Sequence, residues 1–471
     1  MKLFSLRLTT LKSKLYAIVF ASLVVRVVAF FILPSSGSSL TPDEGAYAET
    51  SRRLASGEMN DTLFSDNLLV QSRSFLYPSA LIIKLGIDPL AAVRIVSSVY
   101  GLLTLVYLIK ILIIFLDDHH AKNLRIPTRT KPLVLIVLIY AFLPSHFFWS
   151  IVGLRESSVE FWVVFISFQF QKLLISQMTR RRAPLILVGL SIPFLFSSRP
   201  QIGWVLSTSL ILYCVFKSFR KSSLRIVIPF LLFGVTVGYV ISSPISIEKT
   251  MSYSLENLDL SQISPNAIEN LQKCYKDGEV ILLAGVRYLC KQAPDAGTSI
   301  KIKNSSNPLV VHTGAIEQHH KWNQEGAASV IRTLHCPFDS GSKISNYGCL
   351  VWRAPYTTFT FMFRPLLGPD VTSISSLFAS IENILWLGAF AFIICMLIRN
   401  RNLAFLEVLV PPILFMCLYS IAAGAYEGNM GTAFRHKSLI LWVVILLLAS
   451  TIVATQQRKA EQQGFSGSSQ E

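Results

Sequence analysis

The sequence predicts an all-α polytopic membrane protein, and three observations carry this prediction. Hydrophobic residues make up 52% of the 471 residues, the mean hydropathy is +0.51, and apolar runs of about 20 residues recur along the chain. The formal net charge of +16 is divided into short basic clusters between those runs, which is typical of topology signals. This pattern argues against a soluble protein and against a nucleic-acid-binding protein.

About ten helices approach the ~20-residue length of a membrane crossing. They are expected at about 15–33, 91–116, 132–152, 157–175, 184–198, 201–216, 226–242, 377–398, 403–423 and 437–455. The first follows a basic start and lacks a clear cleavage site, so we interpret it as an uncleaved span. The segment Phe75–Gly86 is amphipathic and short for a crossing, and we expect it to lie at the membrane interface.

The basic clusters fall on alternate loops and predict the topology. They lie at the amino terminus, 117–131, 176–183, 217–225, 399–402 and the carboxy-terminal tail. By the positive-inside rule these segments are cytoplasmic, so both termini face the cytoplasm of a plasma (inner) membrane protein and the first loop faces outward. The predicted parts are a transmembrane region 1–243 containing the outer loop 34–90, an extracytoplasmic insertion 244–373, transmembrane helices 374–455 and a tail 456–471.

Cysteine placement agrees with this topology. Cys274, Cys290, Cys336 and Cys349 all lie in the predicted outer insertion. An even number of cysteines on that side suits an oxidising compartment, and sequence neighbours form the simplest of the three pairings, Cys274 with Cys290 and Cys336 with Cys349. Four free thiols would require every basic cluster to be inverted, and the spacings do not resemble a zinc site. No residues are predicted as metal ligands.

An acidic segment directly after the first span is the strongest local signal for function. Thr41 is a predicted N-cap, Pro42 occupies the first helical position, and Glu44 lies three residues past the cap, which completes a capping box. The helix is expected to run to Ser56 and to stop at Gly57. Asp43 and Glu44 either only cap this surface helix or place a general base at the membrane surface, with Asp43 as the base and Glu44 as its helper or cap.

Arginines on the predicted outer side need a reason, because the positive-inside rule disfavours them there. They are Arg94, Arg155, Arg199, Arg364 and Arg435. One explanation is an ion pair with a nearby acid, for which the candidates are Asp88 for Arg94, Glu156 for Arg155 and Glu427 for Arg435. As a group, guanidinium groups at a membrane surface are suited to bind the phosphate or pyrophosphate of a lipid headgroup.

Together, the acid and the arginines form a coherent chemistry. A polyprenyl-phosphate sugar presents its anomeric carbon at the surface, a carboxylate removes the proton of an acceptor, and arginines stabilise the departing phosphate. Such a direct displacement inverts the anomeric centre. Tyr47 and Glu156 are our candidates for contact with the acceptor or the sugar.

The residues of the first outer loop and the following span resemble the GT-C superfamily of membrane glycosyltransferases, which includes protein O-mannosyltransferases and aminoarabinose transferases. The matching positions are Pro42-Asp43-Glu44, Tyr47, Ala48, Gly57, Tyr77-Pro78, Leu81 to Gly86, Arg94, Ser97 and Gly101. The resemblance covers about 40–110 and implies a lipid-linked sugar donor and a catalytic Asp at the position of Asp43. The chain lacks an Asp-x-Asp in its first two outer loops, which argues against the metal-dependent branch, although the need for a divalent ion stays open.

Two other classes remain as alternatives. An O-antigen polymerase or ligase also has many spans, a large outer loop and outer arginines, and uses a lipid-pyrophosphate oligosaccharide, but it does not need the acidic loop after the first span. A transporter or flippase is expected to place ionisable residues at mid-membrane, where Arg26 and Glu382 are the only good candidates. The sequence therefore favours a cell-envelope glycosyltransferase with a glycan, lipid or protein acceptor.

Overall fold

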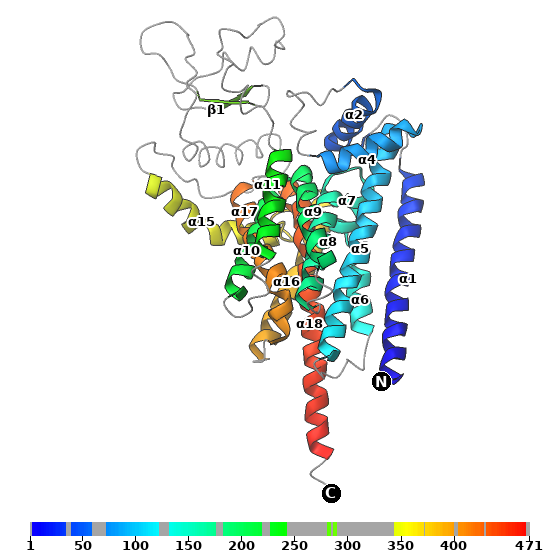
Figure 1. The fold of residues 1–471 in the computed structure, drawn as a ribbon, viewed down its shortest axis with the longest axis vertical. Coiled ribbons are helices and arrows are strands. Elements are labelled where there is room, and N and C mark those ends of the chain that lie inside the picture. Colours follow the sequence, from blue (N-terminus) through cyan, green and yellow to red (C-terminus); the bar gives the residue numbers. More distant parts are fainter. Residues whose placement is uncertain are drawn as a thin grey trace, which may run out of the picture.

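The computed structural model describes most of the chain, and the account that follows concerns only the residues it describes. These are 2–33, 39–58, 72–121, 131–175, 182–218, 227–242, 280–283, 286–289, 343–371, 373–399, 404–427 and 430–467. The fold they form is a helical bundle whose long axis is vertical in Figure 1.

Apolar runs build the first part of the bundle. The helices are α1 (Lys2–Ile32), α5 (Pro89–Ala121), α6 (Lys131–Phe142), α7 (Pro144–Ile151) and α8 (Glu156–Ile175). Between α6 and α7 the chain bends by 43°, because Pro144 begins a new helix where its missing N–H is not needed. Helix α5 packs against α1, α7 and α8.

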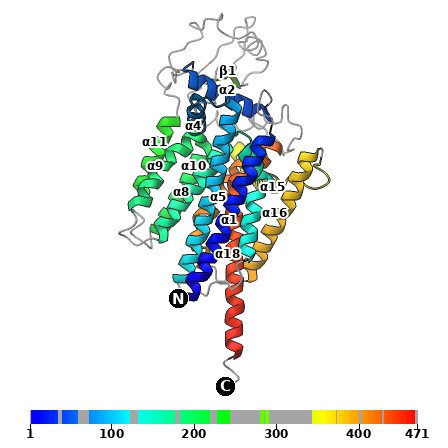
Figure 2. The same ribbon diagram turned by 90° about the vertical axis from the view of Figure 1, so that its right-hand side faces the viewer.

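The second part contains α9 (Arg182–Ser198), α10 (Pro200–Ser218), α11 (Val227–Ser242), α16 (Ile374–Arg399), the short 3₁₀ segment η5 (Ala404–Leu409), α17 (Val410–Tyr426) and α18 (Met430–Gly467). Figure 2 shows α9, α10 and α11 together on one side of the bundle and α16 on the other. Helix α18 is central, since 78% of its most apolar window is buried, against 22% for α1 and for α16. The outer helices therefore present apolar side chains to lipid.

Each of the ten predicted spans has a helix in its place, but the predicted number of crossings is not confirmed. Among the described residues six helices are long and apolar enough to cross a membrane, or up to seven when the bent pair of α6 and α7 is taken as one span. Helices α9 and α11 are apolar but contain only 17 and 16 residues. The chain is a helical membrane protein with at least two shorter apolar helices packed among its spans.

Two short helices cover one end of the bundle. They are α2 (Pro42–Ser56) and α4 (Arg73–Lys84), and they pack on each other and on α5. Both termini lie at the opposite end of the bundle (Figure 1). Helix α4 occupies the segment predicted to be amphipathic and interfacial, and one side of it is buried through Phe75 and Leu76.

The predicted insertion contains two features that its sequence did not indicate. One is a pair of antiparallel strands, β1 (Val280–Leu283) and β2 (Val286–Leu289). The other is α15 (Lys343–Phe363), an amphipathic helix that packs against α17 and, less extensively, α16 and α18. Cys349 on α15 is disulfide-bonded, while Cys274, Cys290 and Cys336 lie outside the described residues, so the predicted pairing remains a prediction.

Candidate functional site

The candidate site is at the end of the bundle covered by α2, and the caps of α2 fix where its acidic residues lie. Thr41 has extended backbone, and its Oγ1 accepts a hydrogen bond from the Glu44 N–H at 3.2 Å. Pro42 follows at the start of the helix, and Gly57, at φ 77°, ends it with its N–H bonded to the Leu54 carbonyl. The predicted start and stop of this helix are confirmed.

Glu44 does not complete the predicted capping box. Its fully buried carboxylate accepts hydrogen bonds from Arg94 Nε at 2.6 Å, Leu40 N at 2.7 Å and Gly153 N at 3.1 Å. Although burial acts to raise the pKa of Glu44, the Arg94 guanidinium and the two backbone N–H groups outweigh it and hold this pKa below the ordinary value. Glu44 thus ties α2 to α5 and to the turn before α8.

This ion pair also revises the assignment of Arg94. The sequence suggested Asp88 as its partner, but Asp88 instead caps α5 through the N–H groups of Leu90 and Ala91. Arg94 is 2% exposed and bonded to Glu44 through both Nε and Nη2. Its guanidinium is engaged within the protein, so the geometry does not support a role for Arg94 in phosphate binding.

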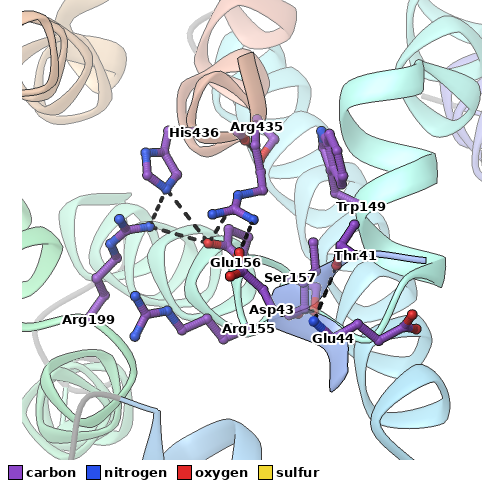
Figure 3. Close-up of polar contacts among 12 residues, drawn as sticks. Thr41, Asp43, Glu44, Trp149, Arg155, Glu156, Ser157, Arg199, Arg435 and His436 are labelled. Atoms are coloured by element: carbon purple, nitrogen blue, oxygen red, sulfur yellow. Dashed lines mark hydrogen bonds and ion pairs between the residues drawn. The ribbon is translucent and has the colours of Figure 1, made fainter. Parts of the chain in front are cut away.

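Glu156 is the centre of a cluster formed by residues of α2, α8 and α18 and of the break between α9 and α10 (Figure 3). It is the first residue of α8, where the helix dipole favours a carboxylate. Its Oε1 lies 3.5 Å from Arg199 Nη1, 3.5 Å from Arg435 Nε and 3.7 Å from His436 Nε2. Its Oε2 is buried and has no hydrogen-bond partner among the described residues.

Asp43 lies at the exposed edge of this cluster. Its Oδ2 accepts a hydrogen bond of 2.6 Å from Arg435 Nη1, which joins residues 392 positions apart. The Asp43 side chain is 51% exposed, whereas that of Arg435 is 17% exposed. A half-exposed carboxylate therefore stands beside a guanidinium that is mostly enclosed by the protein, with Glu156 on its inner side (Figure 3).

His436 is part of the cluster and was not among the predicted site residues. Its Nε2 lies 2.6 Å from Arg199 Nη1, and its Nδ1 is bonded to the Glu427 carboxylate at the end of α17. The only sequence signal for it was its place beside Arg435 in an outer segment. We refer to Asp43, Glu156, Arg199, Arg435 and His436 as the α8 cluster.

The other predicted site residues lie around the α8 cluster or apart from it. Arg155 lies beside Arg199 at the margin of the α8 cluster in Figure 3, and its Nη1 donates to Ser72 Oγ at 3.0 Å. Arg364 forms a separate ion pair in which its Nε donates to Asp370 Oδ2 at 2.8 Å. The structure therefore brings Arg155, Arg199 and Arg435 together and leaves Arg94 and Arg364 in ion pairs of their own.

Tyr47 lies one helical turn after Asp43 but faces the protein interior. Its ring is 4% exposed and packs edge-on against Phe75, with ring centroids 5.5 Å apart. Burial raises the pKa of its hydroxyl to about 12. Tyr47 belongs to a small apolar core beneath α2 and α4, with Val93, Val96 and Leu154 among its members.

The chemistry available at this end of the bundle is that of anion binding next to a base. Arginine presents a planar set of donors suited to phosphate oxygens, and two arginines, Arg199 and Arg435, here flank a single buried carboxylate. Within the described part of the chain no group of three or more His, Cys, Asp or Glu side chains is arranged to hold a metal ion.

Comparisons with known proteins gave only weak likenesses. No family model and no curated protein matches the chain. Among solved structures it is similar to ArnT from Cupriavidus metallidurans in the apo state, with 12% identity over 93% of this chain and 77% of that chain, at a TM-score of 0.36. The structure of the same protein bound to undecaprenyl phosphate is 13% identical over 92% of this chain and 77% of that chain, at a TM-score of 0.36. ArnT is of the class that the sequence resemblance named, but likenesses this low support no argument about the function of this chain.

Proposed function

We propose that this chain is an integral membrane glycosyltransferase that transfers a sugar from a polyprenyl-phosphate donor to an acceptor at the extracytoplasmic surface. The observation that carries this proposal is the contact of Asp43 with Arg435 at the edge of the α8 cluster. In this contact a half-exposed carboxylate lies against Arg435, with Arg199 close by, at one end of the bundle, which supports a role for Asp43 as a base next to an anion site. Membrane insertion makes a lipid-linked donor a natural substrate for such a site.

In the proposed reaction, Asp43 removes the proton of an acceptor hydroxyl or amine as that atom attacks the anomeric carbon. The bond between the anomeric carbon and the phosphate oxygen breaks, and its electron pair leaves with the polyprenyl phosphate. Arg435, Arg199 and Arg155 stabilise the negative charge of that phosphate, so no general acid is needed. The acceptor attacks from the opposite face, and the configuration is inverted.

The contact with Arg435 bears on how Asp43 would act. The Asp43 carboxylate accepts a hydrogen bond from Arg435 Nη1, and the proposed reaction needs this carboxylate to turn to the acceptor. The phosphodiester anion of the donor, bound to Arg435, would compete for the same N–H donors and free Asp43 for the acceptor. We assign Asp43 as the catalytic base, Glu44 as the residue that holds α2 in place, and Glu156 as the candidate for contact with the acceptor or the sugar, whereas the buried Tyr47 packs in the core beneath α2.

The remaining assignments of this proposal follow from the predicted topology. The end of the bundle with α2 and α4 faces outward, both termini are cytoplasmic, and the insertion 244–373 covers the same outer side, with its cysteines as disulfides. Helix α1 begins and helix α18 ends at the pole opposite α2 and α4 (Figure 1), which supports placing both termini on one side.

The test is transfer of radiolabelled sugar by purified protein from a panel of polyprenyl-phosphate and polyprenyl-pyrophosphate donors. Asp43→Asn is compared with Asp88→Asn, an exposed Asp at the same end of the bundle whose cap an Asn preserves. We expect Asp43→Asn to reduce transfer at least 100-fold, the usual scale for loss of a general base, and Asp88→Asn to retain it. Full activity of Asp43→Asn would refute the assignment. Transfer only from a pyrophosphate-linked oligosaccharide would instead indicate a polymerase or ligase.

A further inference from the structure

His436 lies between a carboxylate and an arginine in the part of the bundle where three helices meet. It is 1% exposed, near the start of α18. One ring nitrogen faces Glu427, the residue that ends α17, and the other faces Arg199, which occupies the break between α9 and α10. Because each ring nitrogen has a partner, the orientation of the His436 ring is fixed and the position of its proton depends on those partners.

The partners of the ring determine its tautomer. A guanidinium has only N–H donors, so the 2.6 Å contact between Arg199 Nη1 and His436 Nε2 is a hydrogen bond in the tautomer whose Nε2 accepts. In that tautomer the ring carries its proton on Nδ1, from which it donates to the Glu427 carboxylate. The backbone of both residues is also held, since Tyr419 donates to the His436 carbonyl at 3.4 Å and the Glu427 N–H is bonded to the Ala423 carbonyl at 2.8 Å.

Arg199 depends on this contact for its direction. Its other contact in the α8 cluster, to Glu156 Oε1, is 3.5 Å long and therefore weak. An arginine side chain has many rotamers, and ordering it before a ligand arrives removes an entropic cost from binding. With Nη1 held by His436, the guanidinium lies in the α8 cluster beside Glu156 and faces the group around Arg435 (Figure 3).

We propose that Glu427 and His436 are positioning residues that hold the Arg199 guanidinium ready for the donor phosphate. The chain of contacts is carboxylate to imidazole N–H, then imidazole nitrogen to guanidinium N–H. This inference rests on the proposed function, since it takes the phosphate as the group that Arg199 binds. It assigns no proton transfer to His436, which acts only through Arg199.

The test uses substitutions that replace the hydrogen-bonding group of one ring nitrogen of His436 at a time. The amide of Gln reaches the position of Nε2 and supplies an oxygen that accepts from Arg199, whereas the amide of Asn reaches only the position of Nδ1. Binding of farnesyl phosphate to the purified full chain is measured for the wild type, His436→Gln, His436→Asn, Arg199→Gln and the double variant His436→Asn/Arg199→Gln.

We expect Arg199→Gln to weaken farnesyl phosphate binding about tenfold, the scale of one charge-assisted hydrogen bond. His436→Asn should weaken it to the same extent, His436→Gln should remain within about threefold of the wild type, and the double variant should be no weaker than either single variant, because coupled residues are not additive. A merely structural histidine would not be rescued by Gln in preference to Asn.

The outcomes distinguish the inference from the function on which it rests. If the wild type does not bind farnesyl phosphate, both are overturned. If the wild type binds and Arg199→Gln weakens binding, then normal binding by His436→Asn, additive losses in the double variant, or equal losses in His436→Gln and His436→Asn overturn the inference alone. If Arg199→Gln binds normally, Arg199 is not a phosphate ligand and the positioning role is overturned with it.

A ligand-free measurement keeps the proposal testable should His436→Asn fail to fold. Nitrogen-15 NMR of wild-type protein labelled at its eight histidines, with His436 assigned by its loss in His436→Gln, reports which ring nitrogen is protonated. The proposal requires a neutral ring protonated at Nδ1. A ring protonated at Nε2, or at both nitrogens, would overturn it.

Discussion

Replacing Glu44 by Gln tests whether the buried ion pair with Arg94 holds α2 in place. The substitution keeps size and one acceptor oxygen but removes the charge that faces Arg94, which is only 2% exposed. Breaking a buried ion pair from one side costs about 3–5 kcal/mol, because the remaining charge is buried without compensation. Since Gln still accepts from the backbone N–H groups of Leu40 or Gly153, we expect the lower end, about 3 kcal/mol of unfolding free energy.

The assay is reversible denaturant or thermal unfolding of the purified protein, with Glu49→Gln as the matched control. Glu49 is on the same helix and forms an ion pair with Arg52, but the two side chains are 55% and 43% exposed, so its loss should cost no more than about 0.5 kcal/mol. A double variant, Glu44→Gln/Arg94→Met, should recover part of the loss because no unpaired charge remains. Equal stability of Glu44→Gln and Glu49→Gln would refute the reasoning.

The same ion pair predicts the direction of a pH effect. The pKa of Glu44 is lower in the folded protein than in the unfolded chain, so its stabilising contribution is fully present above the unfolded value, about 4.3 for Glu. That contribution is lost as the pH falls through the lower folded value. The difference in stability between the wild type and Glu44→Gln should therefore shrink on acidification, and a difference that widened there would contradict the sign.

Three further variants probe other parts of the structure. Arg435→Gln should reduce sugar transfer about 100-fold and weaken prenyl-phosphate binding, measured with the assays above, because a ligand of the leaving phosphate is lost; unchanged binding would contradict this. Asp370→Asn should destabilise the protein by about 1–2 kcal/mol at neutral pH, because the Arg364 guanidinium holds the pKa of Asp370 below its ordinary value, and the loss should vanish in acid. Gly153→Ala should cost about 1–3 kcal/mol, since a Cβ there would lie 2.4 Å from a side chain of α5, whereas Gly388→Ala meets nothing within 4 Å and should be neutral; equal unfolding midpoints would refute the packing argument.

Capping signals in the local sequence were sufficient to predict both ends of α2, the helix that contains Asp43. Thr41, Pro42 and Gly57 define its two ends through contacts within a few residues, and the structure has those ends. The apolar runs likewise located the helices of the bundle. The number of crossings was less predictable, because α9 and α11 are apolar but shorter than a bilayer-spanning helix. Helix α15 was missed because its amphipathic sequence contains Arg353 and Pro355 and has no long apolar run.

The pairing of charges could not be predicted, because it depends on how distant helices meet. The carboxylate of Glu44 bonds Arg94, Leu40 and Gly153 instead of the N-cap backbone that its spacing indicated. Arg435 reaches Asp43 across 392 positions, and nothing in either local sequence specifies that contact. His436 could have been suspected only from its place next to Arg435.

The most direct test of the proposed reaction is a single-turnover measurement with a donor labelled separately in its sugar and its phosphate. If the account is correct, wild-type protein transfers the sugar to the acceptor with inversion and releases one equivalent of labelled polyprenyl monophosphate per sugar, and Asp43→Asn releases neither while still binding the donor. Sugar transfer by Asp43→Asn at the wild-type rate, or release of polyprenyl pyrophosphate instead of the monophosphate, would contradict it.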